Sequence, residues 1–330
     1  MELVEQNISG VKLEKLRKDV LKKTGLLKKL PAVCFLAFAV IALTKNWHFF
    51  ASLLKNGWED SVTTGALFRL LGDFMMAAIL AGGIFLFYMM LVWKKAYDRF
   101  NFSFKNRYVL DVLRQLPGFS DLRYRSQGGF SFEEVEFMNF IPGGCKEFYQ
   151  SSDELTGRLN GITFRAGNVK TSGEPKGRGN LPDLLFEGQI IAFDSFDDRK
   201  ISDDFVRVFS QKAFSQAKHT ADPVGIQTEN SLFNENFVVL AENAHNAFYI
   251  LTPQVMEQIS EFEEAMEGKV SLSFYKNTLY VACSQFHNPF DAFVDVPIEE
   301  QRQHIEKDAG ILISAGEILV RACSGKGRVK

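Results

Sequence analysis

The chain has 330 residues and a formal net charge of −2 at neutral pH, which is enough length for a membrane hairpin plus one large or two small globular units. The charge is unevenly distributed. Residues 1–29 carry eight Lys and Arg against four Asp and Glu, whereas residues 94–330 carry 27 against 33. This acidic C-terminal part lacks the basic surface that nucleic acid requires, so we predict no nucleic-acid partner. The basic N-terminus is better matched to anionic lipid.

Residues 10–29 alternate leucines and valines near helical spacing with lysines on the other face, which predicts a basic amphipathic helix. Such a helix is either an anchor at the lipid surface or the positive flank that orients a membrane span. A cleaved signal peptide fits less well, because the charged segment before the first apolar run is too long.

Two apolar runs follow. Leu30 to Thr44 is a marginal span alone and reaches a sufficient length when it continues past Lys45 to about residue 52. Residues 74–93 contain no charge, and about twenty helical residues at roughly 1.5 Å each cross the roughly 30 Å of hydrocarbon. We therefore predict a transmembrane hairpin over residues 30–93, with spans at about 30–52 and 72–93. Ala78 and Gly82 form a small-x-x-x-small pair that would let the two helices approach closely.

Lysines and arginines are concentrated before the first span and after the second. The bias of such residues toward the cytoplasm predicts a multi-pass protein of the cytoplasmic membrane with both termini inside. The predicted organisation is a basic cytoplasmic segment at 1–29, the hairpin at 30–93 and a cytoplasmic domain at 94–330.

The cytoplasmic part combines helical and strand patterns. Residues 94–116 repeat an apolar residue every four positions, which predicts a helix that ends before Pro117-Gly118. Further helices are expected after Thr252-Pro253, with threonine as the N-cap, and from Pro297, where Ile298, Ile305, Leu312 and Leu319 recur every seven residues. The predicted strands are Leu159–Lys170, Leu184–Phe193, Phe205–Phe209, Val224–Glu229 and the hairpin Val270–Tyr275 with Thr278–Cys283.

The fold class that these patterns favour is α+β, with a mixed, mainly antiparallel sheet and flanking helices after the N-terminal transmembrane hairpin. Several phrases then resemble a bacterial domain-of-unknown-function family, number 3137 of that series. The phrases are FEGQIIAFDSF at 186–196, FNENFVV at 233–239, AFYILTP at 247–253 with Met256, SFYKNTLYVA at 273–282, and Asp153-Glu154 with Gly157.

The resemblance covers roughly residues 94–290 and implies two N-terminal spans and a cytoplasmic α+β domain. It implies no activity. It suggests a protein partner, with LemA-type coiled-coil membrane proteins as candidates, because some relatives are associated with them by genomic context. The sequence departs from the family pattern near Asp153 and after Phe193, so no site residue is carried over from it.

Residue patterns for catalysis or metal binding are weak. The five histidines form no H-x-x-x-H pair, and the four cysteines form no C-x-x-C pair, so no metal ligand or cofactor-binding residue is predicted. Cys283 and His287 are four residues apart but need not meet. The acidic segment Asp194, Asp197, Asp198, Asp203 and Asp204 lacks the order of an EF-hand, and a solvated loop is expected there. Catalytic residues therefore stay unknown.

Three functions fit these observations. The first is a membrane-anchored cytoplasmic binding or scaffold module with the lipid bilayer and a protein as partners. The alternative is an unrecognised enzyme at the cytoplasmic membrane face, which would use Asp153 or Glu154. A transporter subunit fits less well, because the spans carry no charge near mid-membrane.

Overall fold

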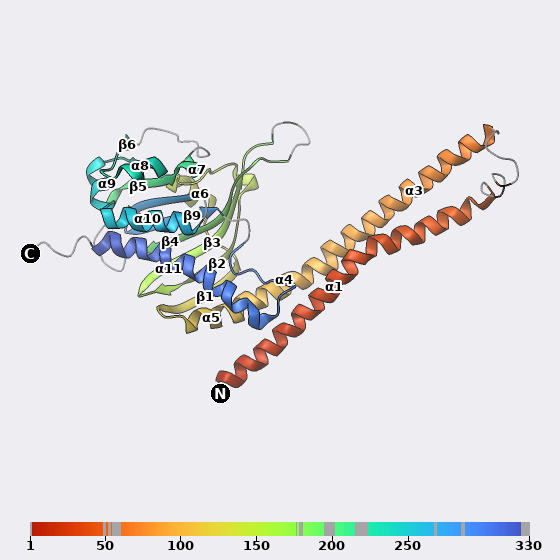
Figure 1. Cartoon of the computed structure of the whole chain (residues 1–330), viewed down its shortest axis with the longest axis horizontal. Coiled ribbons are helices and arrows are strands. Elements are labelled where there is room, and N and C mark those ends of the chain that lie inside the picture. Colours follow the sequence, from red (N-terminus) through yellow and green to blue (C-terminus); the bar gives the residue numbers. More distant parts are fainter. Residues whose placement is uncertain are drawn as a thin grey trace, which may run out of the picture. The chain divides into compact units, whose positions relative to one another are not determined.

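The structure is a computed structural model in which the chain forms two compact units (Figure 1). The helical unit comprises Met1–Phe104 and Ala292–Glu299, and the sheet unit comprises Lys105–Asp291 and Glu300–Lys330. The residues that it describes are 2–48, 51, 54, 61–175, 177, 181–194, 202–214, 224–266, 269–284 and 288–324.

The helical unit contains the two predicted apolar helices. They are α1 (Glu2–Lys45) and α3 (Ser61–Tyr88), and α3 continues through the π-helical segment η1 (Met89–Trp93) into α4 (Lys94–Ser103). Two helical stretches, Gly10–Lys45 and Leu67–Gln115, are long and apolar enough to cross a membrane. In each, only 11% of the most apolar window is buried, whereas the core helix of a water-soluble domain would be mostly buried. These helices therefore indicate membrane association.

Alanines lie where α1 and α3 meet. Ala39 and Ala42 of α1 and Ala77 and Ala81 of α3 are buried, each at most 7% exposed. The predicted pair of Ala78 and Gly82 is wrong by one position: Ala78 is exposed. One residue turns a helix by about 100°, so of two overlapping small-x-x-x-small patterns only one can face the partner.

Polar contacts join α1 to the second helix at both ends of the apolar region. At one end Trp93 Nε1 donates a hydrogen bond to Thr24 Oγ1 (2.8 Å). At the other, Asn46 Nδ2 donates to Asp73 Oδ2 (2.7 Å), and Lys45 Nζ lies 3.4 Å from Asp73 Oδ1. The intervening segments are about 30 Å long in both helices, at about 1.5 Å per residue, which equals the hydrocarbon thickness.

The basic amphipathic segment 10–29 is part of α1. Its apolar stripe lies against protein, since Leu13 and Val20 are 2% and 1% exposed and α1 contacts α4 and η1. Leu16 and Leu27 are half-buried. The stripe is therefore not presented to a lipid surface, which favours the interpretation of this segment as the positive flank of a span.

The sheet unit is built on a nine-stranded sheet whose described pairings are all antiparallel, in the order β1-β2-β3-β4-β9-β8-β5-β7-β6. This confirms the α+β class and the mainly antiparallel sheet. The strands are β1 (Phe119–Gln127), β2 (Gln150–Leu159), β3 (Ile162–Ser172), β4 (Leu184–Asp194), β5 (Ser202–Ser210), β6 (Val224–Ile226), β7 (Phe237–Ala241), β8 (Val270–Lys276) and β9 (Thr278–Ser284).

Helices precede, connect and follow the strands. The predicted helix 94–116 is present as α4, a π-helical segment η2 (Phe104–Val109) and α5 (Leu110–Gln115). The other helices are α6 (Phe132–Met138), η3 (Lys146–Phe148), α7 (Gln211–Phe214), α8 (Ser231–Asn236), α9 (Ala244–Ile250), α10 (Pro253–Ala265), η4 (Ile298–Gln301) and α11 (Arg302–Ser324).

The predicted β4, β5, the β8–β9 hairpin, α10 and α11 are confirmed. Thr252 caps α10 by accepting a hydrogen bond from the Val255 amide. In α11, Ile305, Leu312 and Leu319 are buried, as expected for a helix that docks on a domain.

The predicted strand Leu159–Lys170 is wrong at its start. Leu159 ends β2, and Asn160 and Gly161 form the turn into β3 with φ of +52° and +84°. A two-residue turn with both φ values positive favours Asn-Gly, which is the hairpin signal that the strand prediction overlooked. Strands β1, β2 and β7 were also not predicted, and the strand expected at Val224–Glu229 ends at Ile226.

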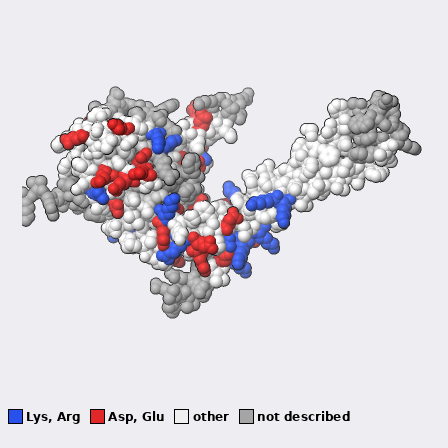
Figure 2. Space-filling model, in the orientation of Figure 1, with Lys and Arg blue, Asp and Glu red and all other residues white. Residues whose placement is uncertain are grey.

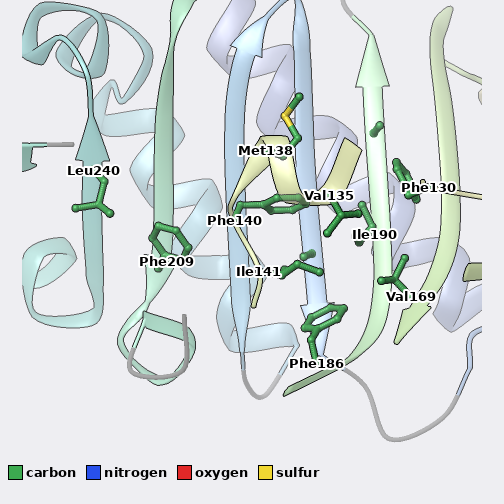
Figure 3. Close-up of a cluster of buried hydrophobic side chains, with 12 residues drawn as sticks. Phe130, Val135, Met138, Phe140, Ile141, Val169, Phe186, Ile190, Phe209 and Leu240 are labelled. Atoms are coloured by element: carbon green, nitrogen blue, oxygen red, sulfur yellow. The ribbon is translucent and has the colours of Figure 1, made fainter. Parts of the chain in front are cut away.

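The two faces of the sheet are covered by different elements. α11 packs on the face that carries Phe193, and a Cβ on Gly316 would lie 3.3 Å from that ring, so glycine lets the helix approach. Side chains alternate along β4, so Ile190 and Ala192 point to the other face, where they join the cluster beneath α6 (Figure 3). Val135 and Met138 of α6 belong to this cluster, and Figure 3 shows Val135 between Phe140 and Ile190.

Gly188 allows β4 to approach β9, and substituting it tests this contact. A Cβ at Gly188 would lie 2.0 Å from the Cys283 carbonyl oxygen, so Gly188→Ala must move backbone. We expect Gly188→Ala to lower the free energy of unfolding by at least about 1–3 kcal/mol, measured by thermal unfolding of the full chain in detergent. Gly225→Ala in β6 is the control, because a Cβ there has nothing within 4 Å. Equal stability of the two variants would contradict the packing.

Candidate functional site

Asp153, one of the two carboxylates that the sequence singles out, lies at an irregularity in β2. The pairing of β2 with β3 shifts register between Ser152 and Leu155, and Asp153 has φ +57°. This left-handed conformation is uncommon for an L-residue other than Asn, Asp or Gly. It turns the carboxylate of Asp153 away from the alternation of the strand and into a polar cluster.

The cluster is centred on Lys105, which is 2% exposed. Its Nζ lies 3.0 Å from Asp153 Oδ1 and 2.5 Å from Asp291 Oδ1. The Tyr124 hydroxyl donates to Asp153 Oδ1 (2.5 Å), and Asn168 Nδ2 donates to Asp153 Oδ2 (3.2 Å). A buried ammonium requires such partners, because leaving it unpaired in the interior costs several kcal/mol.

The environment of Tyr124 keeps its phenol protonated. Burial raises the pKa of Tyr124 well above its ordinary value near 10, and the hydrogen bond and negative charge of Asp153 raise it further. The phenol is therefore a hydrogen-bond donor to Asp153 and not a base.

Glu154, the neighbouring carboxylate, belongs to a separate contact. It is 4% exposed and accepts a hydrogen bond from Arg125 Nε (2.5 Å). The cavity beside Asp153 has a volume of about 10 Å³, which is room for one water molecule. Asp153 and Glu154 therefore do not converge on a space that a substrate could enter, and the geometry gives no support to an enzyme built on this pair.

The other candidates from the sequence are not brought together either. Cys283 is fully buried, and burial raises the pKa of its thiol, whereas His287 lies outside the described residues. In the acidic segment, Asp194 accepts a hydrogen bond from Thr278 Oγ1 (3.0 Å), and Asp204 accepts one from Asn246 Nδ2 (2.9 Å).

Asp194 ends β4, and Asp203 and Asp204 lie in β5, so the loop prediction is wrong for these three residues. Asp197 and Asp198 are not among the described residues, so for them it stays a prediction. Within the described ranges, no group of three or more His, Cys, Asp or Glu side chains is placed to hold a metal ion.

A much larger groove, which sequence reasoning missed, opens in the sheet unit. Its volume of about 730 Å³ falls within the range of about 300–1,000 Å³ that is typical of small-ligand sites. The described residues that line it are Ile141, Pro142, Leu184, Leu185, Phe186, Glu187, Lys212, Ala213, Phe262, Ala265, Met266, Lys269, Ser271, Ser284, Lys307, Asp308, Gly310, Ile311 and Ser314.

The groove is formed where several elements end or begin. The start of β4 contributes Leu185 and Phe186, the end of α10 contributes Phe262 and Met266, and α11 contributes Ile311. Because these residues are dispersed along the chain, no local motif could have indicated the groove. The partial sequence signal is the apolar face of α10, because Phe262 and Met266 are four residues apart and so lie on one side of a helix.

Comparison with known proteins finds one family that matches part of the chain. Residues 185–319 match a family described as "Protein of unknown function (DUF3137)", which confirms the predicted resemblance over this segment. The match does not extend to residues 94–184, which the resemblance was expected to cover and which hold Asp153, Glu154 and Gly157. Neither a curated protein nor a solved structure matches the chain. All groove-lining residues except Ile141, Pro142 and Leu184 lie in the matched segment. Of the polar cluster, Lys105, Tyr124, Asp153 and Asn168 lie outside it.

Removing the ammonium of Lys105 tests whether the polar cluster holds the sheet unit together. Lys105→Met removes the ammonium that pairs with both Asp153 and Asp291. We expect a loss of about 2–3 kcal/mol in the free energy of unfolding, somewhat less than at a fully buried pair, since the carboxylates are 19% and 26% exposed. Lys146→Met, which breaks an exposed pair with Glu133, is the control and should cost less than about 1 kcal/mol. If the two variants lose the same free energy of unfolding, the polar cluster stabilises the sheet unit no more than an exposed ion pair does.

Tyr124 should make stability decrease at alkaline pH. Its pKa is raised in the folded state, so above about pH 10 the unfolded state releases the phenolic proton first and the free energy of unfolding falls as pH rises. Tyr124→Phe should be less stable at pH 8, because the hydrogen bond to Asp153 is lost. It should also show a drop between pH 8 and pH 11 that is smaller by about 1 kcal/mol. A full alkaline drop in Tyr124→Phe would disprove the assignment.

Proposed function

We propose that this protein is a membrane-anchored binding module whose ligand site is the groove of the sheet unit. The observation that carries the proposal is the groove itself: about 730 Å³, with a lining that combines apolar side chains with polar and charged ones and lies almost entirely in the segment matched by the family. A concave apolar site with a few polar groups is the usual form of a small-molecule binding site.

The helical hairpin supports the membrane part of the proposal. Figure 2 shows a long uncharged surface on the helical unit with Lys and Arg gathered at one end of it. Exposed lysines at this end include Lys28 and Lys29 of α1 and Lys94 and Lys95 of α4. Basic residues beside a span remain on the cytoplasmic side, so both chain termini and the sheet unit are proposed to be cytoplasmic.

A protein partner is a further part of this proposal. A LemA-type membrane protein stays the candidate that the family resemblance suggests. Crosslinking in intact membranes, followed by purification of the full chain and mass spectrometry, tests it. Recovery of a LemA-type protein at the level of an unrelated membrane protein would remove this candidate.

Filling the groove tests the proposed function directly. Ala265 is exposed and lines the groove at the end of α10, so Ala265→Trp should occupy the site without disturbing the core. Native mass spectrometry of the full chain, purified from membranes, should show co-purified small molecules on the wild type and at most about a tenth as much on Ala265→Trp.

Gln254→Trp is the matched control, since residue 254 is exposed on the same helix and does not line the groove. It should retain the co-purified molecules. An identical set of bound molecules on the wild type and both variants would disprove the groove as the site.

A further inference from the structure

We propose that the ligand of the groove is a single-chain anionic lipid, namely an acyl chain that ends in a carboxylate. This inference rests on the groove being the binding site and adds the chemistry of what it holds. The lining divides into two chemically different sets of side chains, and each set matches one part of such a molecule.

The first set is apolar and matches an acyl chain. Leu184, Leu185 and Phe186 of β4 are joined by residues of α10, α11, α7 and the loop after α6: Phe262, Ala265, Met266, Ile311, Ala213, Ile141 and Pro142. Burial of apolar surface contributes about 25 cal/mol per Å², so a flexible hydrocarbon chain gains affinity in proportion to the length that it buries here.

The second set is cationic. Lys212 of α7, Lys269 before β8 and Lys307 of α11 line the groove with two carboxylates, Glu187 and Asp308, a formal excess of one positive charge among the described lining residues. Of these carboxylates, Glu187 also pairs with Lys170 at 3.2 Å, and Asp308 also accepts a hydrogen bond from the Phe290 amide (2.7 Å). Lysine ammonium groups on an apolar groove complement an anionic head on an apolar tail.

The size of the groove and the membrane anchor favour a lipid over a protein segment. A stable protein interface buries about 800 Å² on each partner over a broad surface, whereas this is a single concavity of small-ligand size. The chain also carries two helices that are long and apolar enough to hold it at a bilayer, where single-chain lipids are available.

Photocrosslinking in a bilayer tests the proposal. The full chain is reconstituted in nanodiscs of neutral phosphatidylcholine with a fatty acid that carries a diazirine in mid-chain, or with the alcohol of the same chain. Labelled peptides are then mapped. Both probes dissolve in the bilayer and should label α1 and α3 equally, so labelling of the hairpin is the internal standard.

The acid should label the groove peptides of α10 and α11 about tenfold more than the alcohol. A hydrogen bond to a charged group is stronger than one to a neutral group, and the difference corresponds to about tenfold in affinity. The variant Lys212→Gln, Lys269→Gln and Lys307→Gln should reduce labelling by the acid about tenfold. The control variant Lys146→Gln and Lys276→Gln, at lysines that do not line the groove, should leave it unchanged.

Two results would overturn the proposal, and they are distinguishable. Equal groove labelling by acid and alcohol, abolished by Ala265→Trp, would show that the groove binds without recognising charge, so the ligand class is wrong and the binding function stands. The second result is that the probes label only the hairpin, while other molecules still co-purify with the wild type and not with Ala265→Trp. It would show that the ligand is not this lipid, although the groove would still be the binding site. If co-purification is also insensitive to Ala265→Trp, the proposed function fails as well.

Discussion

The constraint on which the rest of the structure depends is that two long apolar helices expose their side chains. Residues such as Ile41, Ile79 and Phe87 are more than half exposed on α1 and α3, a state that water opposes and hydrocarbon does not. Polar contacts lie toward the ends of the apolar region, where Trp93 contacts Thr24 and Asp73 contacts Asn46 and Lys45. The helical segments between these contacts are about 30 Å long, close to the thickness of the hydrocarbon layer, which indicates membrane association.

The proposed binding function requires an open site in the sheet unit, and the way helices cover the sheet leaves one. α10 and α11 cover one face of the sheet, and the short α6 with its cluster around Phe140 and Ile190 covers part of the other. The groove opens near the start of β4, beside the end of α10 and part of α11. The polar cluster at Lys105 is by contrast closed, and it surrounds a buried ammonium with the carboxylates of Asp153 and Asp291.

Much of the fold could be predicted from the sequence, because periodicity and local turn chemistry act over short distances. The uncharged run 74–93, the Thr252-Pro253 start of α10 and the Lys276-Asn277 turn each signal their own structure. The Asn160-Gly161 turn carried an equally local signal that was overlooked. The facing pair Ala77 and Ala81 could not be chosen over Ala78 and Gly82, since both have the same spacing.

The candidate site could not be predicted, since it depends on contacts between distant parts of the chain. Lys105 meets Asp291 only because the helix before β1 and the loop after β9 are brought together in the folded unit. The groove likewise combines residues from Ile141 to Ser314. The sequence did single out Asp153, but as a possible catalyst; the structure instead shows a carboxylate that holds a lysine and a tyrosine.

The most direct test of the account is the accessibility of Cys145, a partly exposed thiol of the sheet unit, in cells that contain the full chain. A membrane-impermeant maleimide is added before or after permeabilisation, the membranes are washed at high pH, and the label on Cys145 is quantified. The account predicts that the chain stays in the washed membranes and that Cys145 is labelled only after permeabilisation. Release of the chain by the wash, or labelling of Cys145 in intact cells, would contradict it.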